Sequence, residues 1–237
     1  MFDLIAFDAD DTLWHNETLF QATARDFAAL LSSHHPVEWI QERLFATELK
    51  NLGHFGYGIK GFTLSMIETS VELTEGRVTG AEIQTILGWG HAMLQAPIAL
   101  LDGVRETIAA LAREHRLMLV TKGDLFDQES KLARSGLGEH FGAVEIVSEK
   151  STRTYATIMT RHRLTPDRFL MVGNSLRSDV LPVLDAGGAA VHIPYPTTWA
   201  HEQVPDDAIT GRTFATLASI RELPAWLAAR AAEAGPR

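Results

Sequence analysis

The stretch Leu4-Ile5-Ala6-Phe7-Asp8-Ala9-Asp10-Asp11-Thr12-Leu13 decides the fold of this chain. Its first four residues are apolar and show no helical period, which predicts a strand buried in a parallel sheet. Carboxylates follow at once, at Asp8, Asp10 and Asp11. Because an open α/β sheet binds its ligand at the carboxyl ends of its strands, this acidic cluster is a candidate site. Two carboxylates two residues apart can hold a divalent cation, attack an electrophile or move a proton.

The rest of the chain falls into a helical block and an alternating part. Residues 17–95 show helical spacing of apolar residues and no convincing strand, whereas short apolar runs alternate with helices from residue 98 onward. This alternation is typical of a doubly wound parallel sheet, an α/β fold. A helical block of this length is too long for an ordinary connection, so we expect an inserted α-helical domain. The expected division is a core domain of residues 1–14 and 97–237, and a helical domain of residues 15–96. Further strands are expected at residues 117–120, 143–147, 169–172 and 189–193, with a short sixth at 207–210.

Composition excludes several classes of protein. The net charge of -9 argues against a broad nucleic-acid surface, which needs clustered Lys and Arg. The chain has no cysteine, so disulfides, thiolate chemistry and cysteine zinc sites are excluded. We see no run of about 18 apolar residues that would predict a membrane span, and no basic and apolar leader at the N-terminus. We therefore expect a soluble, acidic protein of the cytoplasm that has no nucleic-acid or membrane partner.

Polar residues stand at the ends of four of the expected strands. Each has an ordinary explanation on its own, because an Asp or Thr after a strand is often a helix cap and a lone Lys is usually solvated. Their occurrence together, at one edge of one sheet, is much harder to explain as coincidence. The four groups are Asp8 with Asp10, Thr121 with Lys122, Lys150, and Asn174-Ser175 with Asp179.

In this order, these residues resemble the motifs of the haloacid dehalogenase-like hydrolase superfamily. Asp8-Ala9-Asp10-Asp11-Thr12 fits its first motif, DxDxT, while Thr121 and Lys150 fit the second and third. The segment 173–179 fits the fourth, GDSxxxD, except that Asn174 stands where the family more often has aspartate. The helical block matches the helical cap that part of the family carries between its first and second motifs. The resemblance therefore covers nearly the whole chain, and it implies the phosphatase branch with such a cap.

The resemblance also implies a role for each residue. Asp8 would be the nucleophile that forms an aspartyl-phosphate intermediate, and Asp10 would be the general acid and base. Thr121 would bind the transferring phosphoryl group, and Lys150 would neutralise charge between it and Asp8. Backbone N–H groups at the helix start after Lys122 and Gly123 would suit the phosphate oxygens. The expected Mg²⁺ ligands or supports are Asp8, Asp10, Asn174 and Asp179, whereas Asp11 is expected to be structural.

Substrate choice in this family usually resides in the cap, which draws attention to residues 51–62. Four glycines between residues 51 and 61 predict a loop there. A mobile loop with aromatic residues and the cation of Lys60 would suit a phosphorylated organic substrate. An ordinary helix connection, with its aromatic side chains packed into the helical domain, explains the pattern equally well.

The second aspartate of the first motif separates two reactions within the family. Its dehalogenases displace halide from carbon and lack that aspartate, whereas this chain has Asp10. We therefore expect Mg²⁺-dependent hydrolysis of a small phosphorylated metabolite by a monomer or homodimer. The alternatives are a phosphomutase of the same family, a non-catalytic regulatory or binding protein, and a 2-haloacid dehalogenase.

Overall fold

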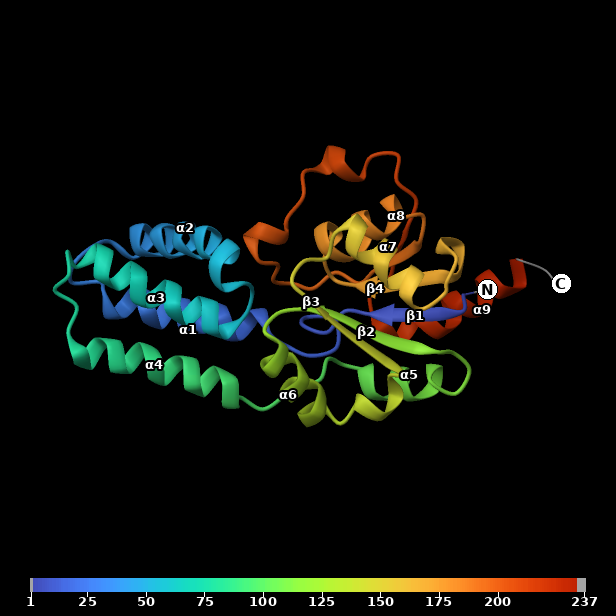
Figure 1. Ribbon diagram of the computed structural model, residues 1–237, viewed down its shortest axis with the longest axis horizontal. Coiled ribbons are helices and arrows are strands. Elements are labelled where there is room, and N and C mark those ends of the chain that lie inside the picture. The colour runs from blue at the N-terminus through green and yellow to red at the C-terminus, as the bar shows by residue number, and fades with distance from the viewer. Residues whose placement is uncertain (1, 234–237) are drawn as a thin grey trace. The chain divides into compact units, whose positions relative to one another are not determined.

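The computed structural model describes residues 2–233 and separates into two compact units (Figure 1). The core unit comprises residues 2–15, Ile98–Lys122 and 129–233, and the helical unit comprises Asn16–Pro97 and Gly123–Gln128. The outer ends of the expected core domain, Met1 and residues 234–237, lie outside the described residues. No helix between residues 2 and 233 is long and apolar enough to cross a membrane.

The core unit is built on one parallel sheet of six strands, in the order β3-β2-β1-β4-β5-β6. β1 lies in its middle, with Phe7 opposite Leu119 of β2 on one side and Val172 of β4 on the other. The carboxyl ends of these three strands therefore meet beside Asp8. The strands are β1 (Leu4–Phe7), β2 (Leu117–Lys122), β3 (Ala143–Val147), β4 (Phe169–Gly173), β5 (Ala189–His192) and β6 (Ala215–Thr216).

Helices cover both faces of this sheet, which confirms the predicted doubly wound α/β fold. Ile5 and Phe7 pack into an apolar core with α5 (Val104–Leu111) and α9 (Leu223–Glu233). Leu4 and Ala6 point to the opposite face and pack with α7 (Thr152–Arg161) and α8 (Leu181–Asp185). Because both faces are buried, all four residues of β1 are apolar rather than alternating.

The helical unit contains the predicted all-helical insertion. Its helices are α1 (Glu17–Leu30), α2 (Val37–Phe55), α3 (Ile59–Leu73) and α4 (Gly80–Gln95). They share a core of their own, separate from the two cores of the sheet. A capping box starts α4, since Thr79 accepts from the backbone of Glu82 and the Glu82 carboxylate accepts from the backbone of Thr79. The core includes Phe27, Ile40, Leu44, Met66 and Ile86.

The glycine-rich stretch is mostly helical, so the predicted loop at residues 51–61 is wrong in extent. α2 continues to Phe55 and α3 begins at Ile59, which leaves only a short turn. Gly56 and Gly58 have φ values of 70° and 108° and make that turn. Gly61 serves packing instead, because a Cβ there would lie 2.8 Å from the carbonyl oxygen of Gly56.

The C-terminal third also differs from expectation at its sixth strand. Asp206–Ile209 forms a 3-10 turn, and the sixth strand is the two-residue β6 further along the chain. The last helix of the described residues, α9, begins at Leu223. A strand of two residues leaves no alternating pattern in the sequence, so β6 had no signature to detect.

Candidate active site

Asp8 is the first residue beyond β1 and lies almost fully buried, at 7% exposure. Its backbone N–H donates to the Val172 carbonyl at 2.9 Å, which continues the pairing of β1 with β4. Its side chain accepts from Lys150 Nζ at 2.5 Å and from Thr12 Oγ1 at 3.1 Å, on different carboxylate oxygens. The carboxylate is therefore fixed in orientation by residues from two separate loops.

Lys150 links Asp8 to a second buried carboxylate, that of Asp179. Its Nζ also donates to Asp179 Oδ1 at 2.7 Å, and its side chain is only 2% exposed. Burial raises the pKa of Asp8 to about 7, although the Lys150 ammonium acts in the opposite direction. Burial alone would lower the pKa of Lys150, but the carboxylates of Asp179 and Asp8 raise it above its usual value. One ammonium thus pairs with two carboxylates and leaves a negative charge uncompensated. That charge favours the binding of a further cation at this edge of the sheet.

Gly173, the last residue of β4, makes room for Asp179. A Cβ at Gly173 would lie 2.2 Å from Asp179 Oδ2 and 2.6 Å from the Asp179 Cβ, closer than side-chain atoms can approach. Asp179 itself lies in one π-helical turn, Leu176–Val180, and its Oδ2 accepts from the Ser175 backbone N–H at 3.0 Å. Such turns occur frequently at functional sites.

Asn174 brings an amide group next to the oxygens of the first motif. In one orientation its Oδ1 faces the oxygens of Thr12, Asp8 and Asp10; in the other its nitrogen donates to Thr12 Oγ1, Asp8 Oδ2 and the Asp10 carbonyl at 3.0, 3.1 and 3.3 Å. The first orientation gathers one carboxylate, one carbonyl and one amide oxygen around a small space. These are the hard oxygen ligands that Mg²⁺ prefers. With the Asn174 oxygen turned toward this space, the donor set fits Mg²⁺.

Asp10 is held by a different set of donors. Lys131 Nζ lies 3.0 and 3.1 Å from its two carboxylate oxygens, and Trp14 Nε1 donates to Oδ1 at 2.7 Å. Asp11, which follows Asp10 in the chain, takes the left-handed backbone conformation, with φ of 61°. Its N–H donates to the Trp14 carbonyl at 2.7 Å, so Asp11 turns the chain back on itself. The first motif thus presents Asp8 and Asp10 in separate environments.

Thr121 and Lys122 end β2, beside β1. Thr121 is 1% exposed, and Lys122 Nζ donates to Glu202 Oε1 at 2.5 Å and to Ser178 Oγ at 2.8 Å. Burial would raise the pKa of Glu202, but the Lys122 ammonium and the hydroxyls of Ser175 and Ser178 lower it to about 2. Lys122 therefore faces a permanent carboxylate, which offsets its charge.

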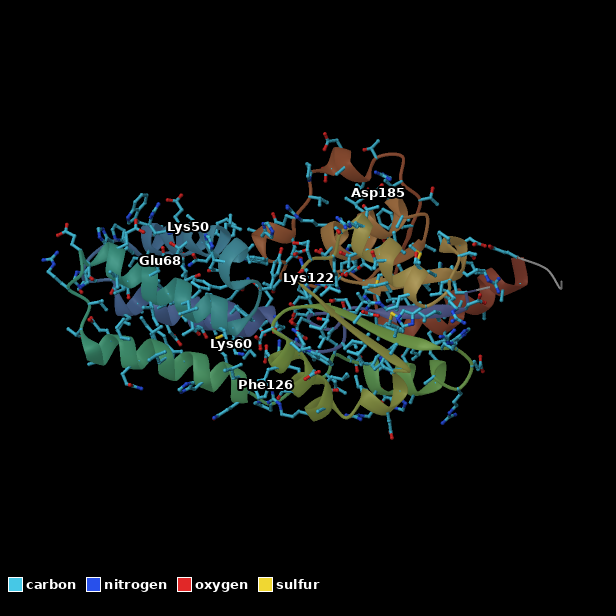
Figure 2. All side chains as sticks on the ribbon, in the orientation of Figure 1. Lys50, Lys60, Glu68, Lys122, Phe126 and Asp185 are labelled. Carbon is cyan, nitrogen blue, oxygen red and sulfur yellow. The ribbon has the colours of Figure 1, made fainter. Side chains whose placement is uncertain are left out.

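Gly123 and Lys60 belong to the helical unit, whereas the other expected site residues belong to the core unit. Lys60 Nζ donates to Asp124 Oδ1 at 2.9 Å and lies 5.6 Å from the centre of the Phe126 ring (Figure 2). This ion pair lowers the pKa of Asp124. Lys60 thus lies against the turn that Gly123 begins.

Sequence reasoning missed Lys131, Trp14 and Glu202. Lys131 is buried on α6 (Leu125–Ser135), where it shares one buried face with Asp127 and Ser135. This spacing of i, i+4 and i+8 repeats a polar residue where a helix against a sheet normally presents an apolar one. This repeat of polar residues was the feature of the sequence that could have identified Lys131 as a buried residue.

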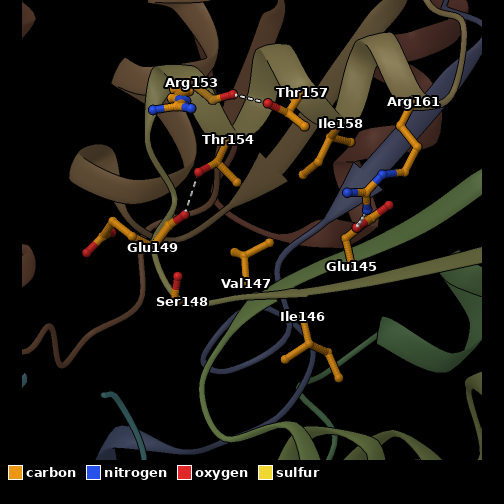
Figure 3. Close-up of a pocket in the computed structure, with 10 residues that line it drawn as sticks. All are labelled: Glu145, Ile146, Val147, Ser148, Glu149, Arg153, Thr154, Thr157, Ile158 and Arg161. Atoms are coloured by element: carbon orange, nitrogen blue, oxygen red, sulfur yellow. Dashed lines mark hydrogen bonds and ion pairs between the residues drawn. The ribbon is translucent and has the colours of Figure 1, made fainter. Parts of the chain in front are cut away.

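A separate hollow of about 370 Å³ lies between β3 and α7 (Figure 3). It is lined by Glu145, Glu149, Arg153, Thr154 and Arg161 among others, and Arg161 pairs with Glu145 at 2.6 Å. None of the strand-end residues predicted from the motifs lines it, so it is distinct from the carboxylate–lysine centre.

The fold and these residues define an α/β protein with a buried carboxylate–lysine centre at the carboxyl edge of its sheet. The chain belongs to the haloacid dehalogenase-like hydrolases, since the model of that family matches residues 2–187. A structure of a haloacid dehalogenase-like family hydrolase from Xanthomonas campestris is 43% identical, with a TM-score of 0.86 over 99% of this chain and 94% of that one.

Two further similarities are to proteins with different named activities. N-acylneuraminate-9-phosphatase of Mus musculus is 28% identical over 127 residues, which span 51% of this chain and 51% of that protein. This chain thus matches about half the length of the curated relative. A 2-haloacid dehalogenase from Pseudomonas syringae has a TM-score of 0.62 over 97% of this chain and all of that one, at 20% identity, which shows the common fold alone.

Proposed function

We propose that this protein is a Mg²⁺-dependent phosphatase that hydrolyses a small phosphorylated metabolite through an aspartyl-phosphate intermediate. The observation that carries the proposal is that two carboxylates on one loop have different hydrogen-bond partners. Asp8 is bound by Lys150 at 2.5 Å in a buried position, whereas Asp10 is bound by Lys131 and Trp14. A nucleophile and a proton carrier require such separate environments.

The reaction proceeds in two steps. An Asp8 carboxylate oxygen attacks phosphorus, the bond from phosphorus to the ester oxygen breaks, and that oxygen keeps the electron pair and takes the proton of Asp10. Water then attacks phosphorus and gives a proton to Asp10, while the bond from phosphorus to Asp8 breaks and inorganic phosphate leaves. Lys150 offsets the negative charge that otherwise repels Asp8 from the phosphate, and Thr121 binds phosphoryl oxygens.

Asp8, the Asp10 carbonyl and Asn174 would hold Mg²⁺, with Asp179 beyond Lys150 as an additional negative charge. When bound, the ion neutralises charge on the phosphoryl oxygens. Asn174 supplies a ligand oxygen without the charge of an aspartate, so a larger share of the charge around the ion falls to Asp8 and Asp179.

The choice of phosphate esters over haloacids rests on Asp10. Halide leaves carbon without a proton, so a dehalogenase has no use for a carboxylate that two donors fix in place. The partial similarity to a curated phosphatase supports the same choice. We propose that the protein acts in the cytoplasm on a free small molecule, as a monomer or homodimer. Lys122, Gly123 and Lys60 are proposed to contribute to substrate binding.

A phosphate-release assay tests the proposal directly. The panel contains sugar phosphates, sugar-acid phosphates, nucleotides and small phospho-acids, each with Mg²⁺ and with EDTA, beside a 2-haloacid series scored for halide release. We expect phosphate release that needs Mg²⁺ and is lost in Asp8→Asn. Halide release without phosphate release would replace the proposal by a dehalogenase. An isomeric sugar phosphate in place of free phosphate would indicate a mutase, and no turnover of any compound would indicate a binding protein.

A further inference from the structure

Lys131 is a buried cation that the proposed chemistry does not use. It lies on α6 in the core unit, and its side chain is 8% exposed. Its Nζ lies 3.0 Å from Asp10 Oδ1 and 3.1 Å from Asp10 Oδ2, so it binds both oxygens of a carboxylate 121 residues away in the sequence. An ammonium buried at this depth requires a carboxylate partner, and Asp10 supplies one.

Trp14 adds a third hydrogen bond to the same carboxylate. Its indole is fully buried, at 0% exposure, and Nε1 donates to Asp10 Oδ1 at 2.7 Å. The backbone bond from Asp11 to Trp14 fixes this indole relative to the loop. Asp10 therefore has donors on α6 and on its own loop, which together fix both of its side-chain torsions.

We propose that Lys131 is a positioning residue that sets the orientation of Asp10 for proton transfer, a role that rests on the proposed function. A general acid must lie within about 2.6–3.2 Å of the atom that it protonates. A misplacement of about 1 Å costs roughly a hundredfold in rate. The two buried lysines thus have different partners: Lys150 binds the nucleophile, and Lys131 binds the proton carrier.

Substrates with different leaving groups separate this role from a merely structural one. p-Nitrophenolate leaves readily without a proton, whereas an alkoxide needs one. We therefore compare kcat/KM, which reports phosphoryl transfer, for p-nitrophenyl phosphate and for the best alkyl phosphate of the panel. Each ratio comes from one preparation, so a loss of folded protein cancels. The variants are Lys131→Met and Lys131→Arg.

Lys50→Met is the matched control. Lys50 is exposed in the helical unit, where it pairs with Glu68 (Figure 2). We expect it to change neither rate. Lys131→Met should lower kcat/KM for the alkyl phosphate by about a hundredfold and that for p-nitrophenyl phosphate by less than about tenfold. Lys131→Arg, which keeps donors to both oxygens, should recover most of the loss.

An equal loss on both substrates, or no loss, would overturn the positioning role. If Lys131→Met does not fold, Lys131→Gln gives the same ratio with a smaller expected difference. A crystal structure of the Lys131 variant provides a readout without activity, since Asp10 should leave its present orientation; an unmoved carboxylate would also overturn the role. Lack of phosphate release by the unaltered protein would instead refute the proposed function, and the crystallographic comparison would still decide the role of Lys131.

Discussion

Gly173→Ala should damage the centre through a single methyl group. The added Cβ would lie 2.2 Å from Asp179 Oδ2 and 2.6 Å from the Asp179 Cβ, so rotation of the carboxylate cannot relieve the clash. The π-helical turn that carries Asp179 must shift, which separates the carboxylate from Lys150 Nζ, now at 2.7 Å, and from the Ser175 N–H, now at 3.0 Å.

The expected loss of stability follows from the buried ion pair of Asp179 and Lys150, which the change breaks. Breaking one partner away from a buried ion pair costs about 3–5 kcal/mol. Because Lys150 keeps Asp8 as a second partner, we expect the lower end, about 3 kcal/mol of the free energy of unfolding. Activity should fall by at least about a hundredfold, since a displaced Asp179 no longer holds Lys150 in its present position beside Asp8.

Urea unfolding and phosphate release measure the two effects. Gly88→Ala is the control, because a Cβ there meets nothing within 4 Å and the residue lies inside α4. It should stabilise the protein by about 0.5–1 kcal/mol, as alanine does for glycine within a helix. A Gly173→Ala protein with unaltered stability and turnover would refute the packing of Asp179 against the end of β4.

Four further changes have expected outcomes. Asp10→Asn should lower phosphatase turnover by at least about a hundredfold, measured by phosphate release, and near-normal turnover would remove Asp10 from its role. Asn174→Asp should tighten Mg²⁺ binding, measured by calorimetry, and an unchanged or weaker affinity would count against Asn174 as a ligand. Lys60→Met should raise KM more than it lowers kcat, whereas the reverse would indicate a catalytic lysine. Burial, together with Glu17, raises the pKa of Glu48 from 4.5 to about 8, so its contribution to stability is lost as the pH rises from 4.5 through 8. The whole shift would amount to roughly 5 kcal/mol at about 1.4 kcal/mol per pH unit, which partial exposure reduces to about 1–2 kcal/mol. Glu48→Gln should therefore raise the free energy of unfolding by about that amount at pH 9 relative to pH 4, by urea titration, and a gain independent of pH would contradict the burial of this carboxyl.

Much of the fold was accessible from the sequence because of one rule of parallel sheets. Strands buried on both faces leave short apolar runs such as Leu4–Phe7, and their carboxyl ends meet at one edge. The structure does bring the side chains of Asp8, Lys150 and Asp179 into contact there. Their chemical roles remain a prediction, because contact alone does not show turnover.

Other contacts had no sequence signature of comparable strength. Lys131 lies on α6, and a charged residue on an amphipathic helix is ordinarily assigned to solvent. Glu202 ends a single 3-10 turn, Ala200–Glu202, and only the tertiary fold brings it to Lys122. The glycine-rich stretch gave a wrong prediction of a long loop. One of its glycines, Gly61, is needed for close packing against the backbone and does not indicate a loop.

The small turn at Gly123–Gln128 changes how the two units are joined. Within residues 2–233 the chain passes between the units at 15–16, 97–98, 122–123 and 128–129, hence four times instead of the two that an insertion requires. The extra pair of crossings tethers the turn after Thr121 to the helical unit through the Lys60–Asp124 ion pair. Exchange of the helical insertion for another, in evolution or in the laboratory, must therefore preserve a partner for this turn, such as Lys60, as well as the two ends of the insert.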